Sequence, residues 1–476
     1  MHHIGSRGFG FGSFRTRIHS GRRFTKSSQN IWSTGLSVLW CGRMNIKVKL
    51  DLAIEKQQAT MVEQIKRLLR FPSVTGRGEE NRGCLESFLA MAREMGFFTR
   101  CTAEKDMGIV ELGQGSEAMG ILVHLDVVDA GDLEKWKHPP FDGTVDQGYL
   151  WGRGTVDDKG PAVMSLVAMK AVKDLGLPFH RKIRLLVGTA EEGEWTDIQH
   201  FKEQFSLPDF GYSPDGEFPI FYAEKGYADV ELVFPHDGQG DIEKLQCGDS
   251  NNTVPSKGML ETKDGRRVIS QGESIHSSTP QGGDNALVKL CQCFDAPNLP
   301  DFVRFVQAYL SQEDYGASLA IDDGGDEWMG EILGRTTAVP TRATLEKDGV
   351  HLVVNVRQRV GTTRQQMEEA FQRLKKSYGF RFQVTNYMDG IRVDKDEPFL
   401  KAMVRVHEEY GVPCEFLAAP GTSYAKAMHR MVSWGPVLPG EPSCAHQENE
   451  RIGLSAMVLA TKMYARYIQQ MTTLEG

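Results

Sequence analysis

The feature that most constrains the fold is a short apolar run, Ile121-Leu-Val, that ends in His124-Leu-Asp126. An apolar run of this length with β-branched residues predicts a buried strand. In an open α/β sheet, ligands bind in the crevice at the carboxyl ends of the strands. Side chains two residues apart on an extended chain share a face, so we expect His124 and Asp126 to point the same way. Taken alone, the tripeptide is common, and an ordinary polar pair at a strand end is its simpler explanation.

Two further segments place carboxylates next to an apolar element. Lys182–Gly188 predicts a second buried strand, and Glu191-Glu192 follows it. Gly152–Pro161 predicts a loop that opens a helix, with Asp157-Asp158 at its start and the apolar run Ala162–Leu175 after it. The helix dipole favours one carboxylate at that position but does not readily explain both. Adjacent like charges cost stability unless a cation compensates them, so each pair suggests a cation site.

Residues 225–389 differ in pattern from the segments on either side. They combine alternating strand patterns and Gly/Asp turns with helices near 285–294 and 364–376, which is typical of an α+β domain. Helical patterns near 397–410 and 452–471 indicate a return to the first domain. We therefore predict an α/β protein whose mostly parallel sheet, with helices on both faces, carries an inserted α+β lid domain. The predicted catalytic domain comprises residues 44–224 and 390–476, and the predicted lid is 225–389.

Composition limits the partners and the compartment. Residues 1–43 contain seven Lys or Arg and no acidic residue; we interpret them as a disordered extension, with an organellar targeting peptide as the second interpretation and RNA binding as a distant third. The net charge of −8 then leaves −15 on the rest of the chain, which argues against nucleic acid as the main partner. No apolar run approaches the roughly 18–20 residues of a membrane span. Eight dispersed cysteines without a Cys-x-x-Cys pair favour the cytoplasm.

The acids and imidazoles that follow these strands and loops form a candidate metal site. Its members are His124, Asp126, Asp157, Glu191, Glu192, Asp215 and His446. Two imidazoles with three or four carboxylates suit a pair of divalent ions about 3.5–4 Å apart. Mixed nitrogen and oxygen ligands favour Zn²⁺, with Mn²⁺ or Co²⁺ as alternatives. The sequence contains no signature of a nucleophilic Ser or Cys, so these residues predict metal-assisted hydrolysis.

The order of the motifs resembles the aminoacylase/glutamate carboxypeptidase superfamily of dinuclear metallopeptidases. Within it, the nearest match is the monomeric dipeptidase branch typified by peptidase V. The similarity runs from about Leu68 to Ile452. The motifs that carry it are His124-x-Asp126, Gly152-Arg-Gly-x-x-Asp157-Asp158-Lys-Gly-Pro161, Glu191-Glu192, Pro214-Asp215 and Ala445-His446-Gln-x-Asn-Glu450.

The resemblance implies a role for each matched position. Asp157 would bridge two ions, His124 and Asp215 would complete one site, and Glu192 and His446 would complete the other. Asp126 would orient His124, and Glu191 would be the general base toward a water held between the ions. His276 would stabilise the oxyanion. The substrate's terminal carboxylate would be held by Arg357, Asn252, Gly421 and Thr422. The family also has a cis peptide at the position of Asp157-Asp158.

The sequence departs from this branch mainly around the substrate. Gln358-Arg359 follows Arg357 where an aromatic residue and Pro are usual, and the loop Ala419–Lys426 is less glycine-rich than in the family. We therefore predict a monomeric di-zinc enzyme that hydrolyses dipeptides, with small peptides as its substrates and neither membrane nor nucleic acid as a partner. The alternative is an N-acyl amino acid deacylase or desuccinylase on the same metal site. A metal-binding protein without turnover is disfavoured because Glu191 and every ligand are present.

Overall fold

The computed structural model describes residues 45–294, 299–311 and 316–473. The chain divides into two compact units, residues 1–49 and 50–476. In the first unit the described residues are Asn45–Lys49, where the Asn45 side-chain oxygen accepts a hydrogen bond from the Lys47 amide at 3.0 Å, as helix α2 (Ile46–Leu69) begins. The extension predicted for residues 1–43 lies outside the described residues.

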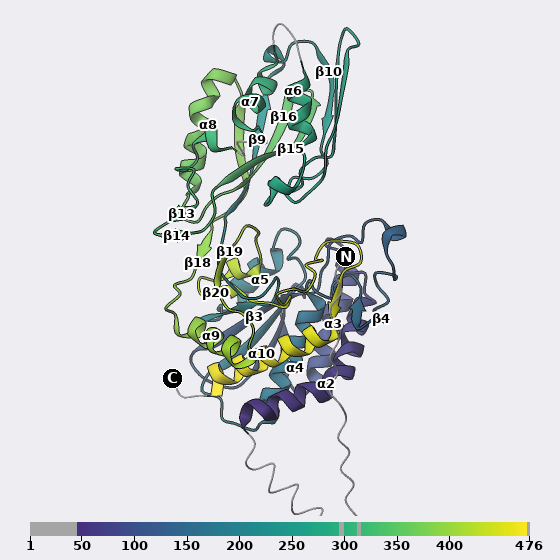
Figure 1. Ribbon diagram of the computed structural model, residues 1–476, viewed down its shortest axis with the longest axis vertical. Coiled ribbons are helices and arrows are strands. Elements are labelled where there is room, and N and C mark those ends of the chain that lie inside the picture. Colours follow the sequence, from purple (N-terminus) through teal and green to yellow (C-terminus); the bar gives the residue numbers. More distant parts are fainter. Residues whose placement is uncertain (1–44, 295–298, 312–315, 474–476) are drawn as a thin grey trace, which may run out of the picture. The chain divides into compact units, whose positions relative to one another are not determined.

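A nine-stranded mixed sheet organises the part of the second unit that we predicted to be catalytic (Figure 1). The strand order is β1-β2-β6-β3-β7-β20-β8-β18, with β19 paired to β8. Pairing is parallel from β6 through β3 and β7 to β20, whereas β1 and β2 at one edge and β18 at the other pair antiparallel. The α/β class is therefore confirmed, and the parallel pairing is concentrated at the centre of the sheet. The strands are β1 (Phe98–Cys101), β2 (Gly108–Leu112), β3 (Ala118–His124), β6 (Lys182–Gly188), β7 (Phe210–Ser213), β8 (Ile220–Glu224), β18 (Ile391–Arg392), β19 (Phe416–Ala419) and β20 (Met431–Ser433).

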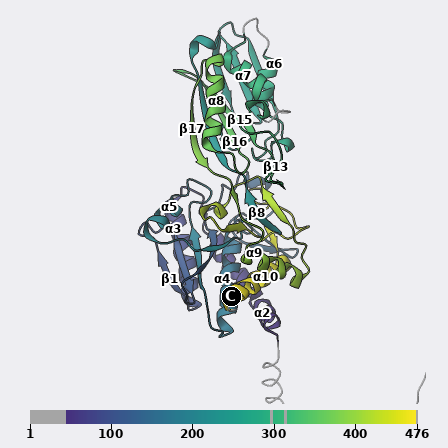
Figure 2. The same ribbon diagram turned by 90° about the vertical axis from the view of Figure 1, so that its left-hand side faces the viewer.

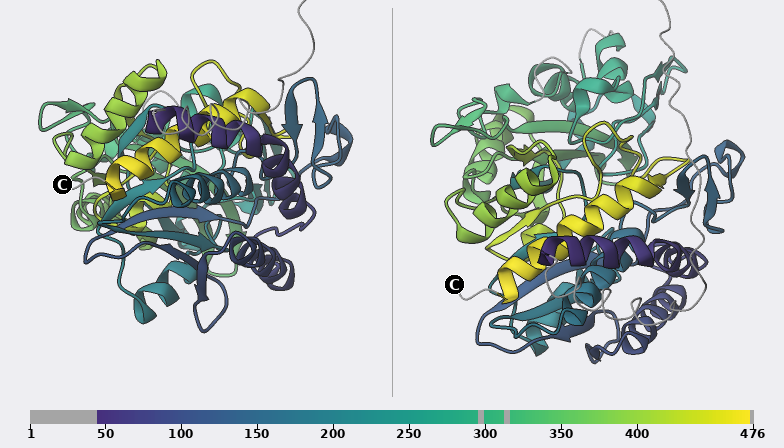
Figure 3. Two further views of the ribbon diagram at one scale, coloured as in Figure 1. Left: turned by 90° about the horizontal axis from the view of Figure 1, so that it is seen from below. Right: turned by 60° about the horizontal axis from the view of Figure 1, so that its bottom comes forward.

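Helices cover both faces of this sheet (Figure 3). On one face, α4 (Lys159–Asp174) packs against β3 and β6, and α10 (Leu454–Thr473) lies along α4. On the other, α5 (Thr196–Gln204) and the short helix η5 (Tyr424–Ala427) share a core cluster with Leu122 and Leu186. Nearly all of α4 is buried, as its all-round apolar sequence predicts. The other α-helices of this part are α2 from Leu50 onward, α3 (Gly78–Glu94) and α9 (Pro398–Tyr410).

A second sheet of seven strands, all antiparallel, is built from the inserted residues (Figure 2). Its order is β12-β11-β10-β15-β16-β9-β17, and helices α6, α7 and α8 share the core cluster that packs against it. Because this sheet begins at Tyr227 and ends at Met388, we propose 225–389 as the inserted domain. Its elements are β9 (Tyr227–Phe234), β10 (Ile242–Cys247), β11 (Lys257–Thr262), β12 (Arg267–Gln271), α6 (Ala286–Cys293), α7 (Asp301–Tyr309), β15 (Thr337–Glu346), β16 (Gly349–Arg357), α8 (Arg364–Tyr378) and β17 (Arg381–Met388).

Two small sheets complete the described structure. In the first, β4 (Thr144–Asp146), β5 (Tyr149–Trp151) and β21 (Arg451–Gly453) bring the segment after His446 beside the loop that follows β5. The second is the hairpin β13 (Glu327–Trp328) and β14 (Glu331–Ile332). Among the described residues, none of the helices combines the length and the apolar character that crossing a membrane requires.

Candidate metal centre

The strand end at His124 sets the orientation of the first imidazole. His124 is the last residue of β3 and is fully buried. Its Nδ1 lies 3.0 Å from the main-chain oxygen of Asp126 and 3.5 Å from that residue's Oδ1. Because these oxygens can only accept, Nδ1 carries the proton and Nε2 presents its lone pair to a ligand. The expected pairing of the two residues is present, although Asp126 lies beyond the extended strand.

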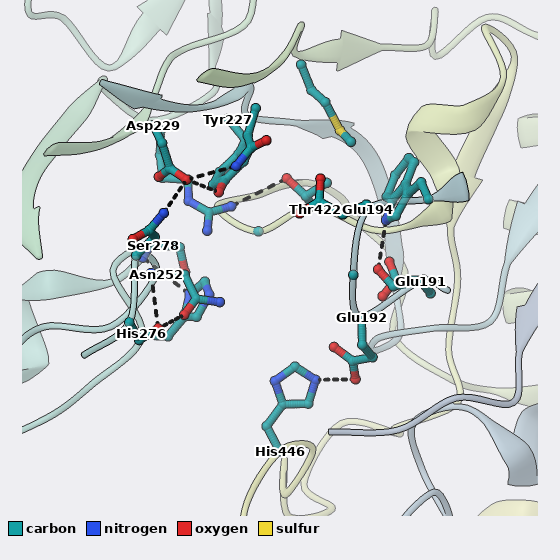
Figure 4. Close-up of a pocket in the computed structure, with 18 residues that line it drawn as sticks. Glu191, Glu192, Glu194, Tyr227, Asp229, Asn252, His276, Ser278, Thr422 and His446 are labelled. Carbon is teal, nitrogen blue, oxygen red and sulfur yellow. Dashed lines mark hydrogen bonds and ion pairs between the residues drawn. The ribbon is translucent and has the colours of Figure 1, made fainter. Parts of the chain in front are cut away.

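Two triads of ligand atoms meet at one carboxylate. His124 Nε2 lies 3.0 Å from Asp157 Oδ1 and 3.7 Å from Asp215 Oδ2. On the other side of Asp157, His446 Nε2 lies 2.9 Å from its Oδ2 and 2.8 Å from Glu192 Oε1, a contact drawn in Figure 4. Within each triad the ligand atoms lie within 4.8 Å of one another. Asp157 therefore lies between the two triads, at the position for which the sequence predicts a bridging ligand.

The donor set fits two divalent cations. His124 Nε2 and Asp157 Oδ1 are buried and neither has a hydrogen-bond partner, although they face each other. Burial and the charges of neighbouring carboxylates, that of Asp157 above all, raise the pKa of Glu192 to about 7. Burial and Asp215 likewise raise the pKa of Glu191 well above its ordinary value. A cation within each triad would contact the ligand atoms that lack hydrogen bonds and would offset the crowded negative charge.

The loop that carries Asp157 is held by a buried carboxylate, Glu450. Its side chain is fully buried and accepts hydrogen bonds from the amides of Gly154 (3.0 Å), Val156 (2.8 Å) and Asp157 (3.2 Å). Arg153 Nη1 donates to the same carboxylate at 2.7 Å. Glu450 follows His446 by four residues, so one side chain ties the two ligand-bearing loops together. Glu450 belongs to the sequence motif around His446. Its hydrogen bonds to the loop of Asp157 could not be predicted from that motif, because they join segments that are far apart in the sequence.

A second set of contacts fixes the loop of the paired glutamates. The Asp126 carboxylate accepts hydrogen bonds from the amides of Glu191 and Glu192, each at 3.1 Å. Asp197, which is also fully buried, accepts from the amide of Thr189 at 2.7 Å and from the Tyr424 hydroxyl at 2.6 Å. Asp126 therefore positions both the imidazole and the acid loop. Sequence reasoning missed Asp197 and Tyr424, for which no motif gave a signal.

The metal triads open onto a pocket of about 550 Å³. Figure 4 shows Glu191, Glu192 and His446 on one side of it and His276 and Asn252 on the other. The pocket is lined by every predicted substrate residue together with the predicted base: Glu191, Asn252, His276, Arg357, Gly421 and Thr422. Asp157 joins the buried ligands to this pocket, because it contacts His446. The structure thus brings together all of the site residues that the sequence singled out.

His276 presents one ring nitrogen to the pocket as a donor. Its Nδ1 lies 3.3 Å from the amide of Ser278, which can only donate, and 2.7 Å from the Ser278 hydroxyl. Nδ1 is therefore the acceptor, and the proton of the neutral ring is on Nε2. Loss of surrounding solvent, together with the positive charges of Arg357 and His446, lowers the pKa of His276 to about 4. The ring is consequently a neutral hydrogen-bond donor at pH 7.

Arg357 is a buried cation without a carboxylate partner. Its side chain is 4% exposed, and its guanidinium lies over the Tyr227 ring, 4.6 Å from the ring centre. Nε donates to Asn355 Oδ1 at 3.2 Å, and Nη1 donates to Thr422 Oγ1 at 3.4 Å. Burial lowers the pKa of Arg357 to about 10, so the group stays charged at pH 7. Within the described parts of the chain no acid forms an ion pair with it, which leaves its charge available to an anion in the pocket.

Comparison with known proteins places the chain in a family. Residues 120–470, about three quarters of the chain, match the description "Peptidase family M20/M25/M40". The chain belongs to this family. The M20 assignment confirms the metallopeptidase resemblance seen in the sequence motifs, and with it the enzyme class.

Relatives of this M20 chain are matched over nearly their whole length. A protein of Bacillus subtilis (strain 168) named "Putative dipeptidase YtjP" is 29% identical over 470 residues, which cover 88% of this chain and 99% of the relative. Human carnosine dipeptidase 1 shares the fold, with a TM-score of 0.60 at 16% identity, covering 90% of this chain and 100% of that one. The YXEP protein of Bacillus subtilis, described as a dinuclear metal binding peptidase of the M20 family, superposes with a TM-score of 0.53 at 12% identity, covering 88% and 99%. The predicted α/β architecture is therefore an M20 architecture.

Proposed function

We propose that this chain is a dinuclear metal-dependent exopeptidase that hydrolyses dipeptides. The observation that carries the proposal is the pairing of two ligand triads, which share Asp157, with Arg357, a buried cation in the same pocket that forms no ion pair with any described acid. A metal centre beside an anion site suits a substrate with a free carboxylate next to its scissile bond. The name of the Bacillus subtilis relative supports the same activity.

The proposed ligands are the residues of the two triads. His124, Asp157 and Asp215 would hold one ion, and Asp157, Glu192 and His446 would hold the other. We propose Zn²⁺ as the native metal because the ligands mix imidazole and carboxylate, with Mn²⁺ or Co²⁺ as substitutes. When bound, two such ions polarise the scissile carbonyl and lower the pKa of water.

The remaining chemistry belongs to side chains of this protein. Glu191 lines the pocket. Its carboxylate also lies within 4.8 Å of ligand atoms of His124 and Glu192, but the two triads that share Asp157 are complete without it, so we assign it the role of taking a proton from water. The same carboxyl would then pass that proton to the leaving amine. The Nε2–H of His276 would donate to the carbonyl oxygen as negative charge develops on it. Asp126 would position His124 and the loop of Glu191.

The substrate's terminal carboxylate would bind Arg357, with Asn252, Gly421 and Thr422 around it. A planar guanidinium can contact both carboxylate oxygens, and its remaining partners here are neutral. We also propose that the enzyme is a monomer in the cytoplasm. The support for this is the large inserted domain and the dispersed, unpaired thiols of the described cysteines.

A substrate panel on metal-quantified protein tests the function. Protein loaded with Zn²⁺ or Mn²⁺ should release free amino acids from unblocked dipeptides and leave N-acyl amino acids intact. The reverse preference would reject the dipeptidase in favour of a deacylase or desuccinylase. Glu192→Ala, which removes a ligand of one triad, is the control and should lower both the metal content and the turnover. Inactivity of fully loaded protein on both substrate classes would refute the proposal.

A further inference from the structure

One buried carboxylate, Asp229, lies behind the anion-binding wall of the pocket. It is on β9, is 1% exposed, and takes no part in the proposed chemistry. Asn355 is its direct partner on β16, and the two side chains are joined by a hydrogen bond. Since side chains two apart on a strand share a face, Tyr227 lies on the face of Asp229, and Arg357 lies on that of Asn355. The sheet thus places the acid and the cation in one patch, where Figure 4 shows Asp229 beside Tyr227.

Four donors converge on the Asp229 carboxylate. Oδ2 accepts from the Tyr227 hydroxyl at 2.7 Å, from Asn251 Nδ2 at 3.1 Å and from Asn386 Nδ2 at 3.3 Å. Oδ1 accepts from Asn355 Nδ2 at 2.9 Å. The pairing of β17 with β9 shifts register between Thr385 and Met388, and Asn386 has a φ of 46° within that irregularity. Only a group that accepts at both oxygens can satisfy all four donors.

The carboxylate decides which way the Asn355 amide points. Because Asp229 can only accept, the Asn355 NH₂ group must face it, and Asn355 Oδ1 then faces the opposite way. That oxygen accepts from Arg357 Nε at 3.2 Å and from the Ser277 hydroxyl at 2.7 Å. A reversed amide would point its NH₂ group at Arg357 Nε, which can only donate, so the position of Arg357 depends on the acid behind Asn355.

The same carboxylate also supports the loops around the pocket. Ser277, whose hydroxyl donates to Asn355, follows His276, and its amide donates to the Asn252 main-chain oxygen at 2.8 Å. The Tyr227 ring that supports the Arg357 guanidinium is held through its hydroxyl on Asp229. Asp229 forms no ion pair in the described structure, so its charge offsets that of Arg357 without neutralising it by contact.

We propose that Asp229 is a positioning residue for recognition of the substrate's terminal carboxylate, acting through Asn355 and Tyr227 on Arg357. This inference rests on the proposed peptidase function. The ligand is the α-carboxylate of a dipeptide, and a dipeptide amide lacks it. The acid should therefore affect the free dipeptide, which is bound through its α-carboxylate, much more than it affects the amide.

The test compares Asp229→Asn with the wild type on one dipeptide and on its C-terminal amide. The variant keeps the shape but places an NH₂ group among the four donors. Displacement of a binding group by about 1 Å can cost up to 100-fold in rate, so we expect kcat/KM for the free dipeptide to fall by about 10- to 100-fold, mainly through KM. For the amide, kcat/KM should fall by a much smaller factor. A purely structural role would lower both rates equally, and that result would overturn the proposal.

Two further variants keep the test decisive. Thr385→Val is the matched control, because Thr385 Oγ1 donates to the main-chain oxygen of Asp229 at 3.3 Å and not to its carboxylate; it should keep the wild-type preference. Tyr227→Phe keeps the ring beneath Arg357 and removes one donor, so it should raise KM for the free dipeptide by less than Asp229→Asn does. If Asp229→Asn does not fold, Tyr227→Phe decides the matter: an unchanged KM would overturn the proposal.

Crystal structures of the wild type and of Asp229→Asn separate this inference from the proposed function. The variant should show a reversed or displaced Asn355 amide and a shifted Arg357 guanidinium. Arg357 and Asn355 in their wild-type positions would overturn the inference, whatever the activity. If the wild type hydrolyses no dipeptide, the proposed function fails, and the two structures still decide whether Asp229 positions Arg357.

Discussion

Replacement of Glu450 by Gln is the sharpest test of how the metal centre is built. Glu450 Oε1 accepts from the amides of Gly154, Val156 and Asp157, and a Gln at this position can keep these contacts through its own oxygen. The other oxygen, 2.7 Å from Arg153 Nη1, becomes an NH₂ group that faces a donor. Arg153 is 2% exposed and would be left as a buried, unpaired cation.

The expected loss follows from that geometry. Removing one partner of a buried ion pair costs about 3–5 kcal/mol, because the remaining charge stays desolvated. The loop that carries Asp157 should also lose its fixed position, and loss of a group that orients a ligand lowers metal affinity by about 10- to 100-fold. We therefore expect Glu450→Gln to lower both the free energy of unfolding and the affinity for Zn²⁺.

Urea unfolding measures the first quantity, and competition with a chromophoric chelator measures the second. Glu448→Gln is the matched control: this acid lies two residues away and pairs with Lys135, which is 65% exposed, at 3.6 Å, so it should cost less than about 1 kcal/mol. In the double variant Arg153→Met/Glu450→Gln the loss should be smaller than the sum of the two single losses. A Glu450→Gln protein within about 1 kcal/mol of the wild type and with wild-type Zn²⁺ affinity would refute the reasoning.

Three further predictions concern single side chains. Glu191→Gln should keep its metal, measured by elemental analysis, while turnover falls by about 10²- to 10⁴-fold; normal turnover would exclude it as the base. His276→Gln should lower kcat by about 10²- to 10³-fold without moving the limbs of the pH–rate profile between pH 5 and 8, because the ring is already neutral there. Burial lowers the pKa of His351, but hydrogen bonds to Asp348 and Glu231 outweigh it and raise the pKa above its ordinary value. The stabilisation of the folded state by protonated His351 is therefore complete below the unfolded pKa of about 6.5, and it is lost as pH rises through the higher folded pKa. His351→Gln should accordingly lower the free energy of unfolding by up to about 1 kcal/mol in acid and by less in alkali. An equal cost at both pH values, measured by urea unfolding, would contradict that sign.

Elements with a long uniform pattern were predictable from the sequence. The strand Lys182–Gly188 has its predicted bounds, since it is an apolar run closed by polar residues. Strands β7 and β20 have four and three residues and are too short to display a period; their place depends on their neighbours in the sheet. The apolar pattern predicts a helix over Leu85–Gly96, whereas helix α3 begins seven residues earlier, at Gly78, because its first turn is polar and carries Glu79 and Glu80.

The candidate site likewise has residues that the sequence predicted and residues that it did not. The side chains predicted to bind metal stand in short motifs whose residue types suit the chemistry, so the amino-acid sequence alone indicated His124 and Asp157 as candidate ligands. The groups that position them could not be named in this way. An acid within a strand, such as Asp229, has the pattern of a solvent-facing position, and only the pairing of β9 with β16 shows that it is buried against Asn355.

The bridging of two distant loops by Glu450 has a consequence for synthesis of the chain. One triad is complete only when His446 reaches Asp157, and the loop of Asp157 is held only when Glu450 reaches Gly154. A nascent chain that ends before this segment has one imidazole and an unsupported bridging carboxylate, so it cannot assemble both ion sites. The proposed hydrolytic centre therefore cannot assemble until His446 and Glu450 have been synthesised, after all of the proposed inserted domain 225–389.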